Sequence, residues 1–122
     1  MSASWIEKIE GVLPDGQVIP GDVVCYAAYN RKINSPSPFV VWNINGWNSS
    51  TAFRGENLVP VIELTGFGKR LETARKACDA VIEALGKLPR CSVEVVDNGA
   101  SGYDDRNKAS VTWTMSVTFR GR

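Results

Sequence analysis

The sequence predicts an α+β fold, with one long helix and a short N-terminal helix packed on one face of a mostly antiparallel sheet of about four to five strands. Residues 111–119 (VTWTMSVTF) alternate apolar and hydroxyl side chains without a break, which is typical of a strand with one buried face. Residues 69–87 repeat apolar side chains at helical spacing. The length of 122 residues fits a single domain spanning 1–122.

The N-terminal part of the chain predicts a short helix followed by turns. Ser4 and Glu7 stand in the spacing of a capping box, so a helix is expected from there to Val12. Proline and glycine then predict turns at residues 13–16 and 20–21.

Three strands are predicted in the first half of the chain, in segments rich in β-branched and aromatic side chains. They are expected at residues 22–29, 39–44 and 58–64, with polar loops at 31–38 and 45–57. Pro60 lacks a backbone donor, so the third strand is expected either at a sheet edge or with an irregularity at that point.

The second half predicts the long helix and a closing hairpin. The helix has an apolar stripe formed by Leu71, Ala74, Cys78, Ile82 and Leu85. Glu72 and Lys76 have the order and spacing of a helical ion pair, and Gly86 is a natural helix stop. Strands at 91–97 and 111–119, joined by a polar loop at 98–110, predict an antiparallel hairpin.

Composition excludes several classes of function. The net charge of +1 gives no electrostatic basis for binding nucleic acid by the bulk field of the chain, and 43% hydrophobic with 22% charged residues argues against global disorder. No apolar stretch approaches the ~20 residues of a transmembrane helix, and residues 1–11 lack the pattern of a secretory signal. We therefore expect Cys25, Cys78 and Cys91 to be reduced thiols in a cytosolic setting. The absence of histidine excludes histidine-based metal sites and catalytic triads.

Residues that could carry chemistry have simpler structural interpretations. Asp104 and Asp105 could act as acid and base or hold a cation, but Arg106 and Lys108 beside them favour a solvated loop. The glycine-rich segment 65–69 lacks the spacing of a phosphate-binding loop, so a flexible strand-to-helix turn is expected. No nucleophile with a general base can be named, and we expect neither enzymatic activity nor a cofactor.

Aromatic residues raise a second possibility. Trp42 lies in a predicted strand and is expected in the core. Trp47 and Phe53 fall in a predicted polar loop, where exposed aromatic side chains often mark protein interfaces. With Tyr103 they could also stack on bases, which would make the chain a small nucleic-acid or ligand binding module.

The order of the elements resembles that of the tail terminator (tail completion) proteins of long-tailed bacteriophages. The resemblance covers about residues 23–120. It depends on the layout, on the segment Pro38-Phe39-Val40-Val41-Trp42, and on the strand at 59–64 that leads into the helix ETARKACDAVIEAL. Head-closure and head–tail joining proteins of the phage neck share this general architecture, so that alternative stays open.

The resemblance implies a structural role in the virion. Such proteins form a ring, expected to be a hexamer, which caps the finished tail tube at its head-proximal end and stops polymerisation. The implied partners are other copies of the chain, the tail tube protein and the head–tail connector. DNA would pass through the ring without being read, and assembly would take place in the host cytoplasm.

The uncharged hydroxyl row suggests where such contacts lie. Thr112, Thr114, Ser116 and Thr118 form a neutral strand face, whereas a solvated strand face usually carries lysine or glutamate. This row is either a subunit or ring-lining surface or a plain solvent face on which threonine favours the strand. The interface candidates are Arg31, Lys32, Trp47, Phe53, Arg54, Tyr103, Asp104, Asp105, Arg106, Thr112, Thr114 and Ser116. Among them, the bases Arg31 and Lys32 are expected to pair with Asp104 and Asp105 of a neighbouring copy.

Overall fold

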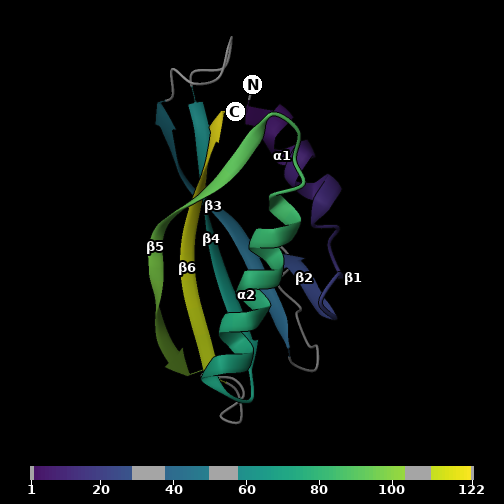
Figure 1. The fold of residues 1–122 in the computed structure, drawn as a ribbon, viewed down its shortest axis with the longest axis vertical. Helices are drawn as coiled ribbons and strands as arrows, with labels where there is room; N and C mark the ends of the chain where they lie inside the picture. Colours follow the sequence, from purple (N-terminus) through teal and green to yellow (C-terminus); the bar gives the residue numbers. More distant parts are fainter. Residues whose placement is uncertain (1, 29–37, 50–57, 104–110, 122) are drawn as a thin grey trace.

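The computed structural model describes residues 2–28, 38–49, 58–103 and 111–121, and confirms the α+β class (Figure 1). These residues form two helices and one six-stranded sheet. In chain order the elements are α1 (Ser2–Val12), β1 (Gln17–Ile19), β2 (Val23–Ala27), β3 (Phe39–Ser49), β4 (Leu58–Gly68), α2 (Leu71–Leu85), β5 (Cys91–Tyr103) and β6 (Val111–Gly121).

The sheet has the strand order β1-β2-β3-β4-β6-β5. All neighbours are antiparallel except β2 and β3, which are parallel. The predicted hairpin of β5 and β6 is confirmed. The sheet has six strands and not the predicted four to five, and the additional strand is β1. This strand has three residues, too few for an alternating pattern to show in the sequence. It is held by pairing with β2, where Gly16 N donates to Cys25 O at 2.7 Å.

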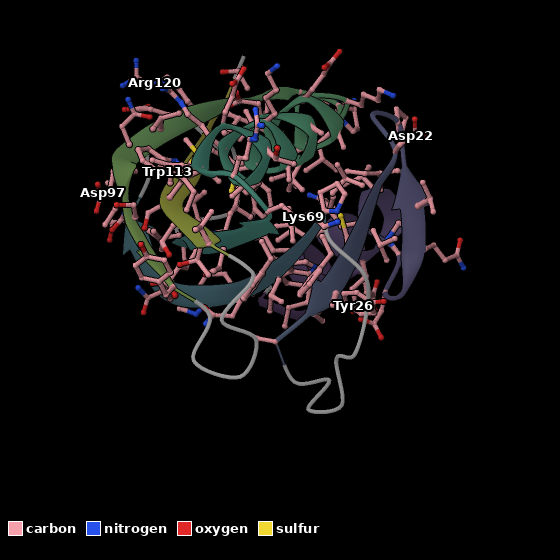
Figure 2. The ribbon with its side chains drawn as sticks, turned by 90° about the horizontal axis from the view of Figure 1, so that it is seen from below. Asp22, Tyr26, Lys69, Asp97, Trp113 and Arg120 are labelled. Atoms are coloured by element: carbon pink, nitrogen blue, oxygen red, sulfur yellow. The ribbon has the colours of Figure 1, made fainter. Side chains whose placement is uncertain are left out.

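Both helices pack on the same face of the sheet. α2 lies mainly against β4 and β6, and Figure 2 shows the sheet curving around this helix. Small side chains allow the close approach: at Gly66 of β4, an added Cβ would overlap the carbonyl oxygen of Ala74 and lie 2.9 Å from Cys78 Sγ. α1 covers one end of the same face, where Trp5 stacks on Phe119 at a ring-centroid distance of 5.0 Å.

The core contains the residues expected from the alternation in the last strand. Met115, Val117 and Phe119 are buried beneath the helices, and Trp42 is buried as predicted. None of the three cysteines forms a disulfide, and all are buried. In α2 the predicted ion pair is present, with Lys76 Nζ 3.0 Å from Glu72 Oε1, and Gly86 caps the helix as predicted.

Three strands extend into segments that the sequence predicts as loops or turns. Residues 45–49 continue β3, residues 65–68 continue β4, and residues 98–103 continue β5. Pairing with a neighbouring strand overrides the turn propensity of these segments, and glycine absorbs the irregularities. Gly46 has φ +124° at a register shift in β3, and Gly99 has φ +114° at a register shift in β5.

Both expectations for Pro60 hold in part. β4 as a whole lies between β3 and β6, but its pairing with β6 runs only from Ile62 to Gly68, so Pro60 pairs with β3 alone. Pro60 also marks an irregularity: the register of β3 shifts between Ile44 and Trp47, which pair with Ile62 and Pro60 respectively. The bulge in the partner strand accommodates the missing donor without ending the ladder.

Candidate interface

The face of the sheet opposite the helices carries three residues of the predicted hydroxyl row of β6. The fourth, Thr118, is buried, and its Oγ1 donates a hydrogen bond of 3.0 Å to Pro60 O. Strand pairing places Thr112 beside Phe67, Thr114 beside Thr65 and Ser116 beside Glu63 of β4. The same residues of β4 are paired in turn with β3. We call the resulting surface the open sheet face. It comprises Phe39, Val41, Asn43, Glu63, Thr65, Phe67, Thr112, Thr114 and Ser116.

An aromatic row crosses one end of the open sheet face. Phe39 and Phe67 stack with ring centroids 4.4 Å apart, and Tyr26 of β2 meets Phe39 edge-on at 5.9 Å. Tyr26 lies on the side of the sheet away from α2 (Figure 2). Because the rings pack on one another, Phe39 is only 8% exposed despite lying on the face without helices. The row gives this end of the surface a rigid, flat and apolar character.

The open sheet face carries little charge. Of its nine side chains only Glu63 is ionisable, and its Oε2 accepts a hydrogen bond of 3.5 Å from Asn45 Nδ2. Further acids lie on the adjacent edge strand β5. Glu94 pairs with Arg120, with the carboxylate oxygen and Nε 3.1 Å apart, and Asp97 lies opposite Ser116. The surface is therefore neutral in its middle and mildly acidic toward β5.

The structure brings three of the predicted interface residues together and separates two others from them. Thr112, Thr114 and Ser116 lie in a row on the open sheet face and are half-buried. Trp47 was expected in a loop but lies in β3, where its ring packs partly against the core. Tyr103 ends β5 with 77% of its surface exposed. The other candidates lie outside the described residues: Arg31, Lys32, Phe53, Arg54, Asp104, Asp105 and Arg106.

The contributions of β3 and β4 to the open sheet face were missed by sequence reasoning. Phe39 and Val41 alternate with Val40 and Trp42, so both faces of this strand are apolar and the pattern is blurred. In β4 the alternation runs through to Phe67, but the flanking glycines resemble a turn. The signal that could have revealed these residues is the alternation of side chains with a period of two, if it is continued through the glycines of β4.

A second notable surface is the basic end of α2, formed by Lys69, Arg70, Arg75 and Lys76, all exposed. Glu72, which pairs with Lys76, is the acid in the first turn. The guanidinium of Arg75 lies 5.6 Å from the ring centroid of Trp113. Leu71 at the same end is 42% exposed. This end of the helix therefore combines excess positive charge with an exposed apolar side chain.

The described residues offer limited chemistry beyond contact. Burial raises the pKa of the Cys25 and Cys78 thiols from 9.0 to about 12, so both are neutral and unreactive at pH 7. In the described part of the chain, no group of three or more cysteines and acids could hold a metal ion. A largely apolar hollow of about 260 Å³ lies beside Ile6 of α1, the end of β2 and Ile44 of β3. Neither α1 nor α2 is long and apolar enough to cross a membrane.

Comparison with known proteins gives no relative from which a function could be transferred. The scan against protein-family models finds no match, and the search of curated proteins finds none either.

Proposed function

We propose that this chain is a structural bacteriophage protein that assembles with copies of itself into a ring and caps the head-proximal end of the tail tube. The open sheet face carries the assembly part of this proposal. The resemblance in the order of elements supports the tail terminator role, in which the ring ends tube polymerisation and binds the head–tail connector. The proposed role requires neither a cofactor nor a catalytic site.

Covering the open sheet face has a low free-energy cost. A partner that covers it would remove threonine, serine and aromatic side chains from water, and only one of the nine side chains is a carboxylate. Hydroxyl groups can exchange a water for a neighbour's polar group at small net cost, whereas buried charges require a matched partner. The half-buried rings of Tyr26 and Phe67 add apolar area that favours association. The desolvation free energy of this surface is therefore lower than that of a surface rich in lysine and glutamate.

The arrangement of layers also suits a ring. A closed ring needs a heterologous contact, in which one patch meets a different patch on the next copy. The helix layer and the open sheet face lie on opposite sides of the molecule and differ in chemistry (Figure 1). A molecule with two unlike sides can join head to tail, and the copies close into a ring where the rotation between neighbours divides a full turn.

The first test is the mass of the purified protein by light scattering, with electron microscopy of the same sample. We expect rings, formed either by the protein alone or on the ends of tubes assembled from the tail tube protein of the same phage. We also expect tubes to stop growing when the protein is added during their polymerisation. A chain that stays monomeric in both settings and leaves tube growth unchanged would contradict the proposal.

The second test places a charge on the open sheet face. Thr114→Lys should abolish ring formation at concentrations where the parent assembles, because the ammonium group would be buried without a partner. Gln17→Lys is the matched control, since it adds the same charge at an exposed position of β1. Circular dichroism establishes that both variants fold. Rings of Thr114→Lys as stable as those of the parent would show that this face is not an interface.

A further inference from the structure

We infer that the open sheet face of one copy binds the basic end of α2 in the next copy. The inference rests on the proposed ring assembly and names the two patches that meet. α2 already covers its own sheet with its buried side. In the ring, the basic end of this helix would cover the neighbour's sheet as well, so that each sheet lies between helices of two different copies.

Charge supplies the first reason for this pairing. Lys69, Arg70, Arg75 and Lys76 surround a single acid, Glu72, at the beginning of α2. The acidic side is the open sheet face with its margin, where Glu63, Glu94 and Asp97 outnumber Arg120. Patches of opposite sign steer the encounter of two copies and disfavour contacts between like patches.

Apolar surface supplies the second reason. Leu71 lies among the basic residues and is 42% exposed. The open sheet face has a matching apolar area at Phe67, which is half-buried and stacks on the buried Phe39. A contact that places Leu71 near these rings removes apolar area from water on both copies. The long stems of lysine and arginine can lie along the hydroxyl row while their charged ends reach the acids.

Position supplies the third reason. α2 and the open sheet face lie on opposite sides of the sheet (Figure 2). The contact is therefore heterologous, and each copy has one patch of each kind left for the next neighbour. A closed dimer would require both patches of one copy to face the same partner, which their positions on opposite sides of the sheet disfavour.

The test reverses the charge of each patch separately. The helix variant carries Lys69→Glu and Arg70→Glu, two exposed residues that have no ion pair among the described residues. The sheet variant carries Glu63→Lys and Glu94→Lys. Asp97 is left unchanged, because its Oδ1 accepts a hydrogen bond from Gly99 N at 3.1 Å. A control variant carries Asp79→Lys and Glu83→Lys, which reverse exposed charges farther along α2.

Each patch variant alone should raise the protein concentration needed for ring formation by about tenfold or more, since close charge pairs across an interface couple strongly. An equal mixture of the two should recover assembly. The acidic helix end of one variant then meets the basic sheet of the other, and the remaining patches keep their original signs. The control variant should assemble like the parent.

The readout is particle mass by light scattering at low and high salt, with circular dichroism to show that each variant folds. Recovery in the mixture should be strongest at low salt, because salt screens the exposed part of the contact. The inference is overturned if either patch variant assembles like the parent, if the mixture fails to recover, or if the control loses assembly to the same extent. A parent that forms no ring, either alone or on tube ends, and leaves tube growth unchanged would instead contradict the proposed function itself.

Discussion

Gly66 offers a sharp test of how the helix layer is seated on the sheet. This residue lies in β4 directly beneath α2, and an added Cβ would overlap the backbone carbonyl oxygen of Ala74. The same Cβ would lie 2.9 Å from Cys78 Sγ, closer than the 3.4 Å at which ordinary contact begins. The obstruction is helix backbone, which cannot turn away as a flexible side chain can. Gly66→Ala therefore forces α2 to move outward.

The expected cost follows from that movement. One extra methyl group in a packed core costs about 1–3 kcal/mol when side chains can adjust. Here the shift separates a helix whose buried side includes Ala77, Val81 and Leu85, so we expect the upper end of that range or more. A loss of about 3 kcal/mol lowers the melting temperature of a domain of this size by roughly 10 °C.

The assay is thermal and urea unfolding of Gly66→Ala and of the matched control Gly11→Ala. Gly11 lies in α1, is exposed, and has no neighbour within 4 Å of an added Cβ. The same substitution should therefore be neutral or stabilise by up to about 1 kcal/mol there, because alanine favours the helix. If Gly66→Ala stays within 1 kcal/mol of the parent, the close approach of α2 to β4 is wrong.

Two further predictions concern the buried thiols and the docking of α1. The pKa of Cys25 and Cys78 is about 12 in the folded chain and 9.0 in the unfolded one, so the folded state holds more protons between these values. The free energy of unfolding should fall as the pH rises above about 9, by at most about 1.4 kcal/mol per pH unit for each thiol. Urea unfolding of the Cys25→Ala, Cys78→Ala variant should show a flatter profile, and an unchanged slope would refute the assignment. Trp5→Ala should cost about 3–5 kcal/mol, because Trp5 is 2% exposed and stacks on Phe119. A loss below 1 kcal/mol in the same assay would show that α1 is not docked.

The elements predicted most accurately are those whose two faces differ strongly. In β6, large apolar side chains alternate with hydroxyls, and Met115, Val117 and Phe119 are buried as this period predicts. In α2, small apolar and charged side chains separate at helical spacing, and the helix is only two residues shorter at each end than expected. Local pattern decides such elements because tertiary contact and intrinsic preference agree.

The elements that were missed depend on partners far away in the sequence. β1 exists because Val18 and its neighbours pair with β2. The end of β5 exists because Ala100 to Tyr103 pair with the beginning of β6, across a bulge that Gly99 makes possible. Such pairing provides hydrogen-bond partners for backbone N–H and C=O groups that would bind water in a loop. The local composition of a segment does not reveal this pairing. Glycine and asparagine here indicate a bulge in a strand, where single-sequence reasoning expects a loop.

The candidate interface was predicted in the same partial way. The hydroxyl row of β6 was visible in the sequence, because its alternation is unbroken. Thr65 and Val41 lie beside that row on the same face. Their place on the surface follows only from the register in which β4 pairs with β6 and with β3. The basic residues at the beginning of α2 can also be seen in the sequence, but there they resemble the polar side of any amphipathic helix. The concentration of these charges at one end becomes meaningful only beside a sheet face that is neutral in its middle and mildly acidic toward β5.

The charges at the beginning of α2 also conflict with the helix that carries them. A helix N-terminus favours acids and a side-chain cap, whereas Lys69 and Arg70 stand at this one and Arg70 makes no capping hydrogen bond. Each misplaced cation costs a few tenths of a kcal/mol in the isolated chain. A carboxylate from a neighbouring copy, such as Glu63, would reverse the sign of this term. It would be attracted by the cations and by the unpaired N–H groups of the first turn at once. Local rules are most often broken where a chain meets a partner, and here the partner that would restore them is another copy of the same sheet.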